Sequence, residues 1–570
     1  MTDKEEIEPV EETKVATGSP KAEKPVEEPK PTHTKDEMFN AVRFGSLTVL
    51  KNILSEMPEL VHETDNQGYS AVHWAAKSGS VDMMEVLVAS KANLNVPTAA
   101  ESKMLPIHWA ASDGKLSTLK FLLDHRCDIN SLDGNGCTPA IVAAQHEEAN
   151  CVIFLVQNGA DLTLADNNGD TALHWSCYKG FIELTGLCTY LCPQVMEKED
   201  NYGQKPIHLA ALRGNADVVE YLVADCGVDA NSKDKNGLTP LALAMKKKQL
   251  ASEWTLRRLA SANIVELVKG LGINRLKESK IVSNIFIGSN DREISAWPWR
   301  IVFASNLMGT MYSIYFALHP SLNDLTLLHT INTMVQTLWW FFFYMCLTAP
   351  AAAVYDEKCR DKGGDITEYE NALTKIGTAS NDADLPNLCH TCRVRKPLRS
   401  KHCKFARRCI NKFDHYCPFV YNTVSRDNYK YFTGCISVHM VVSVCWMVTA
   451  GYYMRREEAT YFFYCFVFFL FLWMLMVGGL TQYHTTLIMK NLTTNEHINS
   501  ARYKYLQNSY GIFDNPFDRG DQAKNIMDGL FPLGKMYYSR EEAVRDRMRL
   551  LDGQDIEGEE LLRPQVSMEV

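Results

Sequence analysis

One seven-residue phrase occurs six times along the first half of this 570-residue chain. It reads SAVHWAA at 70–76, LPIHWAA at 105–111, TPAIVAA at 138–144, TALHWSC at 171–177, KPIHLAA at 205–211 and TPLALAM at 239–245. Successive copies begin 35, 33, 33, 34 and 34 residues apart. A period of this length is typical of a solenoid, in which each unit buries its apolar face only against its neighbours.

The period and the Thr-Pro-Leu-His-x-Ala pattern match the ankyrin repeat, a turn followed by two antiparallel helices. We expect an ankyrin array over 37–250, with a helix at 37–55 acting as a degenerate first repeat that caps it. The histidines of the phrase are interpreted as turn residues and not as metal ligands: His73, His108, His174 and His208.

The segments on either side of the array have a different composition. Residues 1–36 contain many Glu, Lys and Pro residues and almost no large apolar side chains, which predicts a disordered tail. Residues 251–296 are interpreted as a linker, because charged residues interrupt each apolar run before it is long enough to cross a bilayer. The net charge of −9 provides no basic surface of the kind that binds nucleic acid, so we expect no nucleic-acid partner.

Four apolar stretches follow, and none of them contains Asp, Glu or Lys: 297–318, 325–348, 431–453 and 461–481. Each is about as long as a helix needs to be to cross a bilayer. The short connections inside each pair predict two membrane hairpins, 297–348 and 431–481. The ankyrin array, the loop 349–430 and the C-terminal region 482–570 should then share one side of the membrane. We expect that side to be the cytosol, where the 17 cysteines stay reduced.

The loop between the hairpins contains CHTCRVRKPLRSKHCKFARRCINKFDHYC at 389–417. Cys389-x2-Cys392 followed by histidine and further cysteines is metal-ligand spacing, because two thiolates on one tight turn occupy two corners of a tetrahedron. We expect zinc, since thiolate and imidazole ligands suit it. The alternative is a set of unrelated buried cysteines.

The last four residues of this segment, Asp414, His415, Tyr416 and Cys417, include the elements of an activated nucleophile. A free thiol has a pKa of about 8.5, so it needs a basic or cationic neighbour to form a thiolate at neutral pH. His415 can be that neighbour, and Asp414 can orient its imidazole. On spacing alone, Cys417 could equally be another zinc ligand.

The longer pattern resembles the DHHC family of protein palmitoyltransferases. The resemblance covers about 297–531 and includes Thr493-Thr494-Asn495-Glu496 after the last apolar stretch, and Asn515-Pro516-Phe517 with Gly520 and Asn525 in the C-terminal region. Together with the repeats it is similar to the ankyrin-bearing subfamily. It implies that a cysteine takes a fatty acyl group from acyl-CoA and passes it to a cysteine of a protein substrate. Matching positions imply Cys417 as nucleophile, His415 as base and Asp414 as its orienting partner.

The resemblance also implies two zinc sites, of which this sequence retains one. The first is complete, and its ligands are Cys389, Cys392, His402 and Cys409. The second would use Cys403 and three positions occupied here by Ala406, Tyr416 and Thr423. One thiol cannot hold the second ion, so we predict a single structural zinc. Phe405, Tyr416 and Val420 are candidates to replace the lost ion by packing.

The fold class predicted is therefore α-helical: an ankyrin solenoid, a four-span helix bundle and a cytosolic zinc-binding cysteine-rich domain at about 387–430. The function predicted is protein S-acylation in the Golgi or another endomembrane, with the ankyrin repeats recruiting protein substrates. Trp175 is our candidate for a contact with a bound peptide, although an aromatic side chain at a repeat position more often packs between repeats. The alternative is a catalytically weak membrane scaffold that binds partners through the repeats.

Overall fold

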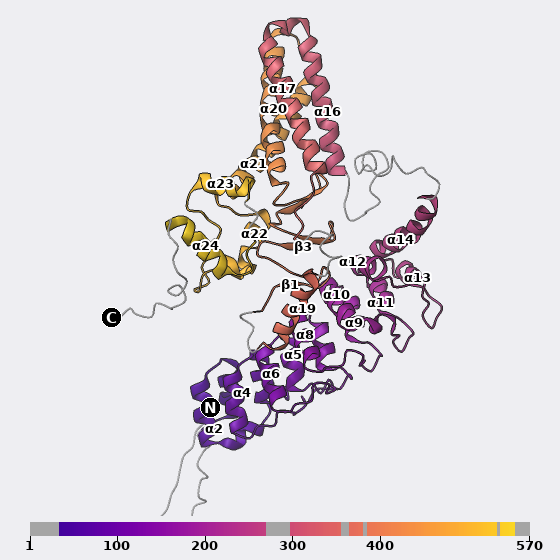
Figure 1. Ribbon diagram of the computed structural model, residues 1–570, viewed down its shortest axis with the longest axis vertical. Helices are drawn as coiled ribbons and strands as arrows, with labels where there is room; N and C mark the ends of the chain where they lie inside the picture. The colour runs from indigo at the N-terminus through magenta and orange to yellow at the C-terminus, as the bar shows by residue number, and fades with distance from the viewer. Residues whose placement is uncertain (1–32, 270–296, 355–363, 380–384, 533–535, 553–570) are drawn as a thin grey trace, which may run out of the picture.

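The computed structural model describes residues 33–269, 297–354, 364–379, 385–532 and 536–552. The molecule is elongated, with the ankyrin array at one end, a bundle of long helices at the other and a small mixed region between them (Figure 1). Most of the tail expected at 1–36 and the second part of the linker expected at 251–296 lie outside the described residues.

The array consists of helix pairs stacked side by side. The pairs are α1 Lys35–Arg43 and α2 Leu47–Glu56, α3 Ala71–Ser78 and α4 Val81–Ala89, α5 Pro106–Ser112 and α6 Leu116–Asp124, α7 Pro139–Gln145 and α8 Ala149–Gln157, α9 Ala172–Lys179 and α10 Ile182–Leu191, α11 Pro206–Arg213 and α12 Ala216–Glu220, α13 Pro240–Lys246 and α14 Leu250–Lys269. Several first helices begin at a threonine whose hydroxyl accepts a backbone N–H, and proline follows Thr138 and Thr239 at the first helical position.

The repeat histidines are structural, as the sequence predicted. Each accepts a backbone N–H at the start of its own helix through Nδ1 and contacts a carbonyl oxygen of the following turn through Nε2. His174, for example, lies 3.2 Å from the Gln204 oxygen. These contacts join neighbouring repeats, so the imidazoles are not available as metal ligands.

The cap differs from expectation because it contains two helices instead of one. The chain turns after Arg43 at Gly45, which has a φ of +78°, a conformation that glycine adopts without strain. Phe39 of the helix before this turn and Ile53 of the helix after it are both buried in the core of the array. The first repeat is therefore a complete helix pair. In addition, α14 packs on α12 and α13, so a helix occupies the first part of the expected linker.

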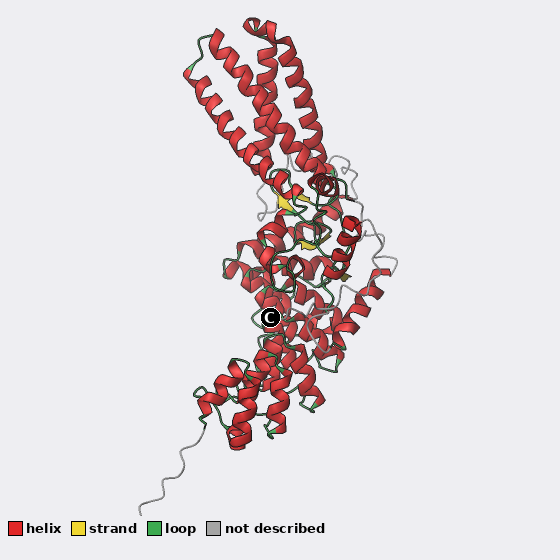
Figure 2. Ribbon diagram, turned by 90° about the vertical axis from the view of Figure 1, so that its left-hand side faces the viewer, coloured by secondary structure: helices red, strands yellow, loops and turns green. Residues whose placement is uncertain are grey.

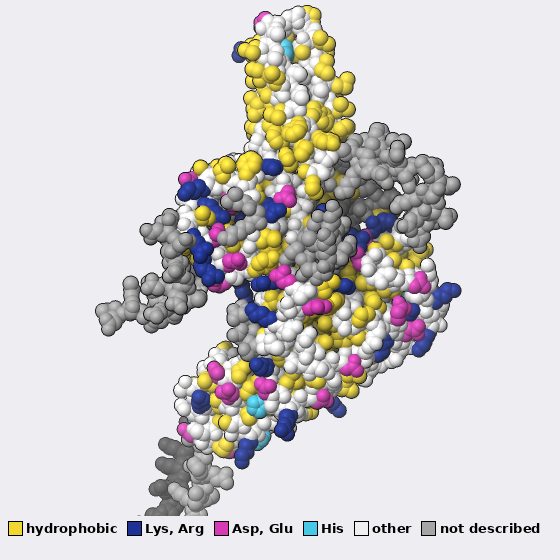
Figure 3. Space-filling view, in the orientation of Figure 1, with side chains coloured by type: hydrophobic (Ala, Val, Ile, Leu, Met, Phe, Trp, Pro, Cys, Tyr) yellow, Lys and Arg dark blue, Asp and Glu magenta, His cyan; other side chains and the backbone are white. Residues whose placement is uncertain are grey.

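Four long helices form the opposite end of the molecule: α16 Trp297–Leu318, α17 Thr326–Thr348, α20 Tyr429–Arg456 and α21 Tyr461–Met489. They run side by side, with the strands and the array beyond one end of the bundle (Figure 2). The surface of the bundle in view shows mainly hydrophobic side chains and uncharged atoms, with a few charged side chains near its far end, whereas charged side chains are scattered over the rest of the molecule (Figure 3).

Among the described residues, two of these helices, α20 and α21, are long and apolar enough to cross a membrane, where the sequence predicted four spans. In the first hairpin, α16 counts only as a shorter apolar helix, Val302–Leu318, and polar side chains lie between α16 and α17. Asn332 donates to Ser313 at 2.8 Å, and Gln336 donates to Thr310 at 2.9 Å. These hydrogen bonds link the two helices, and the polar side chains of Asn332 and Gln336 lower the mean hydropathy of α17.

The region between array and bundle contains short elements: α19 Gly364–Gly377, β1 Leu388–Cys389, β2 Val394–Arg395, β3 Lys401–Cys403, β4 Arg408–Ile410, β5 His415–Cys417, β6 Asn422–Val424, α22 Thr494–Ile498, α23 Gln522–Leu530 and α24 Arg540–Asp552. The strands form three antiparallel hairpins. Because these elements are short, contacts between side chains must stabilise much of the conformation of this region.

Candidate metal centre and nucleophile

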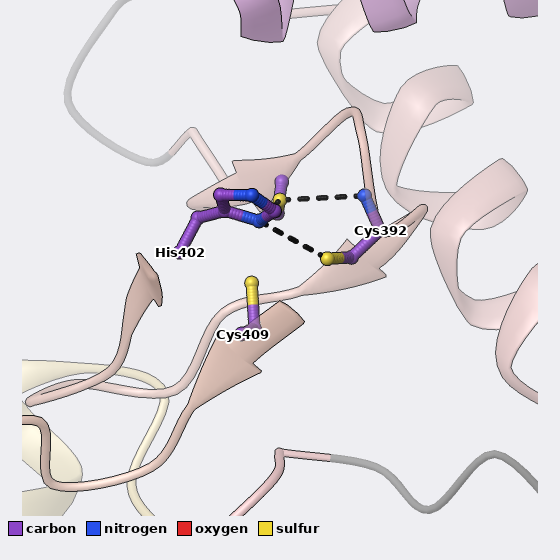
Figure 4. Close-up of side chains that lie close together, drawn as sticks. Cys392, His402 and Cys409 are labelled. Carbon is purple, nitrogen blue, oxygen red and sulfur yellow. Dashed lines mark hydrogen bonds between the residues drawn. The ribbon is translucent and has the colours of Figure 1, made fainter. Parts of the chain in front are cut away.

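Four side chains from the first two hairpins converge on one point. Cys389 and Cys392 lie at the β1–β2 turn, and His402 pairs with Cys409 across the β3–β4 hairpin. Their ligand atoms all lie within 4.8 Å of one another. The Sγ atoms of Cys389 and Cys392 lie 3.4 Å and 3.2 Å from His402 Nδ1. Figure 4 shows the side chains of Cys392, His402 and Cys409 directed towards a common centre.

This arrangement fits zinc. Bond lengths of about 2.3 Å to sulfur and 2.0 Å to nitrogen place the corners of a tetrahedron roughly 3.5–3.8 Å apart, close to the spacing seen here. Hydrogen bonds among the thiols lower the pKa of Cys392 and raise the pKa of Cys409, so the cluster shares its protons, and a bound metal would release them. The four residues predicted as the first site are thus brought together.

The positions of the second family site do not form a ligand set. Cys403 Sγ lies 3.2 Å from the hydroxyl of Thr423, and this thiol is buried beside Ala406. The rings of Phe405 and Tyr416 are 4.1 Å apart between centroids. Aromatic packing therefore occupies this part of the loop. Val420, the third candidate for this packing, instead lies in the core shared with the bundle.

The next hairpin carries the predicted nucleophile. Asp414 is buried, and its Oδ2 lies 2.6 Å from Nδ1 of His415. Burial disfavours the imidazolium, but hydrogen bonds to Asp414 and Cys417 and the charges of these groups outweigh it and raise the pKa of His415 to about 9. Cys417 is 5% exposed and belongs to the buried apolar cluster at the end of the bundle, which also includes Phe343.

A residue 80 positions further along holds the aspartate. Thr494 donates its backbone N–H to Asp414 Oδ1 at 2.7 Å and its hydroxyl to Oδ2 at 2.8 Å. Burial favours the neutral acid, but the bonds to His415 and Thr494 dominate and lower the pKa of Asp414. The Thr-Thr-Asn-Glu motif noticed in the sequence therefore has a physical function, which its pattern alone did not reveal.

Two more features of this site gave no signal in the sequence. His484 of α21 lies beside His415, with ring centroids 5.8 Å apart. Its Nδ1 forms a hydrogen bond of 3.1 Å with the hydroxyl of Tyr429. Arg399 forms a bidentate ion pair with Glu496, at 2.9 Å and 2.8 Å, and both side chains are buried. This pair joins the zinc hairpins to α22, which carries Thr494 at its start.

Two asparagines of the C-terminal motif, Asn515 and Asn525, cap the C-terminal end of α21. Asn515 donates to the Lys490 carbonyl at 2.7 Å, and Asn525 donates to the Met489 carbonyl at 2.8 Å. Carbonyl oxygens at the end of a helix have no partner within that helix, so these amides satisfy them. The other predicted residue, Trp175, lies half-buried on α9 and donates from Nε1 to Asp166 at 3.0 Å.

Residues 383–501 match the family described as DHHC palmitoyltransferase. They form a DHHC palmitoyltransferase domain. Residues 38–133, 107–192 and 197–244 match ankyrin repeats, which confirms the array. The matched residues include the three strand hairpins between array and bundle and also the bundle helices α20 and α21. They contain the Cys/His cluster, Asp414, His415 and Cys417.

Several known proteins match this chain along most of their length. Palmitoyltransferase ZDHHC17 of Rattus norvegicus is 26% identical over 563 residues, 87% of this chain and 88% of that protein. Palmitoyltransferase Hip14 of Drosophila melanogaster is 24% identical over 562 residues, 88% of this chain and 86% of that protein. Probable protein S-acyltransferase 23 of Arabidopsis thaliana is 28% identical over 524 residues, 86% of this chain and 92% of that protein.

Proposed function

We propose that this ankyrin-bearing protein S-acyltransferase forms a thioester on Cys417 with a fatty acyl group from acyl-CoA, then passes that group to a cysteine of a protein substrate. The observation that carries the proposal is the hydrogen-bonded series Thr494–Asp414–His415, which ends at the only cysteine of the third hairpin. Such a series orients and charges an imidazole beside a thiol.

The transfer takes two thioester exchanges. In the first, His415 accepts the thiol proton, Cys417 Sγ attacks the acyl carbonyl carbon, the carbon–sulfur bond to CoA breaks, and CoA leaves with the proton from His415. In the second, His415 takes the proton of the substrate thiol. The substrate sulfur attacks the acyl carbonyl carbon, the carbon–sulfur bond to Cys417 breaks, and the proton passes from His415 to the Cys417 sulfur. Asp414 keeps the imidazole oriented and stabilises its charged form in both exchanges.

We assign one structural zinc to Cys389, Cys392, His402 and Cys409. A zinc ion at such a site contributes folding energy by crosslinking hairpins that have little apolar core of their own. The strand containing Cys417 follows these hairpins directly, so the metal site holds the frame in which the nucleophile is presented.

We place the helix bundle in a membrane, with the three strand hairpins of the DHHC domain at the bilayer surface. Cys417 is buried at the end of the bundle, where an acyl chain on its sulfur can enter the apolar helices while CoA remains in water. The array, the zinc hairpins and the C-terminal helices lie at this same end (Figure 1), which we assign to the cytosol of the Golgi or another endomembrane.

Protein substrates are expected to bind the ankyrin repeats. Trp175 remains our candidate contact because it is half-buried and a peptide can cover the rest of its ring. Trp74 makes the same bond to its repeat, from Nε1 to Asp65 at 3.0 Å, but it also packs edge-on against Trp109. Trp175 has no tryptophan neighbour of this kind among the described residues.

The comparisons favour the enzyme over the catalytically weak scaffold. The similar proteins carry palmitoyltransferase or acyltransferase names, and the residues around His415 form a connected network despite the missing second metal site.

The test is labelling of the purified protein with an alkyne-tagged fatty acyl-CoA. The parent protein should acquire a label that neutral hydroxylamine removes, and Cys417→Ala should acquire almost none. Cys465→Ala removes an exposed cysteine of α21 and serves as the matched control. Equal labelling of Cys417→Ala and the parent contradicts the proposal.

A further inference from the structure

The ankyrin array and the DHHC domain share one hydrophobic core. Tyr369, Leu373 and Ile376 of α19 are buried in the core of the repeats, together with Leu388 of β1. Burying one such aliphatic side chain contributes about 1.5–3 kcal/mol. The junction therefore has the character of a domain interior and not of a tether.

The two parts also approach each other at backbone distance. The Cβ of an alanine at Gly377, the end of α19, would lie 2.5 Å from Gln157 Cβ of α8, and the Asn158 amide donates to the Gly377 carbonyl at 3.2 Å. An alanine at Gly186 of α10 would place its Cβ 3.0 Å from the backbone nitrogen of Thr391. Helix α10 thus lies directly against the zinc loop.

From this helix, the Glu183 carboxylate reaches the loop between the first two zinc ligands. Its Oε2 accepts the backbone N–H groups of His390 at 2.7 Å and Thr391 at 3.4 Å. Its Oε1 lies 3.2 Å from Sγ of Cys389, a zinc ligand. Glu183 precedes Cys389 by 206 positions, so this contact joins two distant parts of the sequence.

The same loop is held from a second direction. The hydroxyl of Tyr369 lies 2.8 Å from Nδ1 of His390, whose side chain is buried. Tyr190 of α10 donates to Glu370 at 2.8 Å, and the guanidinium of Arg393 lies 5.0 Å from the Tyr190 ring centroid. The loop is therefore fixed between α10 and α19.

We propose that Glu183, a residue of the ankyrin array, is a positioning residue for the zinc loop of the DHHC domain. Accepting two loop amides fixes the turn on which Cys389 and Cys392 stand, so both thiolates are held at tetrahedral spacing before the metal binds. Groups that orient metal ligands in this way commonly change metal affinity by about 10- to 100-fold. The ankyrin array is then part of the transferase fold as well as a surface for partners.

The experiment compares three variants of the full-length protein: Glu183→Ala, Glu183→Gln and Asp82→Ala. Glutamine keeps a side-chain oxygen that can accept the loop amides. Asp82 has the same place in α4 that Glu183 has in α10, second in the helix, but it is exposed. The readouts are the rate at which a competing chelator removes zinc and the hydrogen exchange of residues 388–395.

We expect Glu183→Ala to release zinc about tenfold faster or more and to lose exchange protection in this segment. Glu183→Gln and Asp82→Ala should behave as the parent. Zinc release from Glu183→Ala at the parent rate overturns the proposal. Equal acceleration in Glu183→Gln also overturns it, because the retained acceptor should then suffice.

Tyr369→Phe keeps the test decisive if Glu183→Ala does not fold. It removes only the hydroxyl next to His390, so zinc should leave faster from an intact core; an unchanged rate contradicts the proposal. The inference rests on the zinc assignment but not on acyl transfer. A parent protein that holds zinc but is not labelled at Cys417 refutes the transfer while leaving the chelator comparison valid.

Discussion

Replacing Thr494 with valine should slow acylation of Cys417 while leaving the fold intact. The change removes the 2.8 Å hydrogen bond from the threonine hydroxyl to Asp414 Oδ2 but keeps the 2.7 Å bond from the backbone N–H to Oδ1. A hydrogen bond to a charged group contributes about 1.5–3 kcal/mol. If losing this bond raises the activation free energy of Cys417 acylation by the same amount, the acylation rate falls roughly 10- to 150-fold.

The assay is single-turnover acylation with a fluorescent acyl-CoA at saturating concentration. Thr494→Ser retains the hydroxyl and should acylate at nearly the parent rate. Thr374→Val is the matched control, because Thr374 is exposed on α19 and its hydroxyl donates only to a carbonyl of its own helix. Acylation of Thr494→Val at the parent rate, or of Thr494→Ser as slowly as the valine variant, would refute the role assigned to Thr494.

Three further predictions concern charge and metal. Because the pKa of His415 is raised from 6.5 to about 9, its stabilising contribution is complete below pH 6.5 and is lost as the pH rises through 9. Unfolding measured between pH 6 and 10 should show a larger loss for the parent than for His415→Gln, and equal losses would contradict this. Elemental analysis should find one zinc per chain, and Cys392→Ser should lose it; two equivalents would refute the single site. Arg407→Ala should change the free energy of unfolding by only about 0–1 kcal/mol per ion pair, since its pairs with Glu220 and Asp225 are half-exposed, and the change should vanish in high salt.

The array was predictable because a solenoid repeats its local contacts. Three copies of the phrase begin at a threonine that caps the first helix, and four contain a histidine that contacts a carbonyl oxygen of the following turn. The cap was the exception. Its apolar pattern continues through 37–55, and only Gly45, in a left-handed conformation, divides it into two helices.

The convergence of Cys389, Cys392, His402 and Cys409 was also predictable, since close spacing on two hairpins limits where their side chains can lie. The contacts that organise them were not. Asp414 meets Thr494 across 80 residues, and Glu183 meets Cys389 across 206. Such pairs depend on how the array, the hairpins and the bundle pack together, and no local pattern records that. The polar inner faces of the first helix hairpin, with Asn332 bound to Ser313, are a consequence of the same packing.

The most direct test of the account is to locate the acyl group in the protein. After incubation with a fatty acyl-CoA, the purified protein is digested and its peptides are analysed by mass spectrometry with and without neutral hydroxylamine. The account predicts one hydroxylamine-sensitive acyl group on the peptide that contains Cys417. An acyl group found only on other cysteines, or no thioester at all, would contradict it.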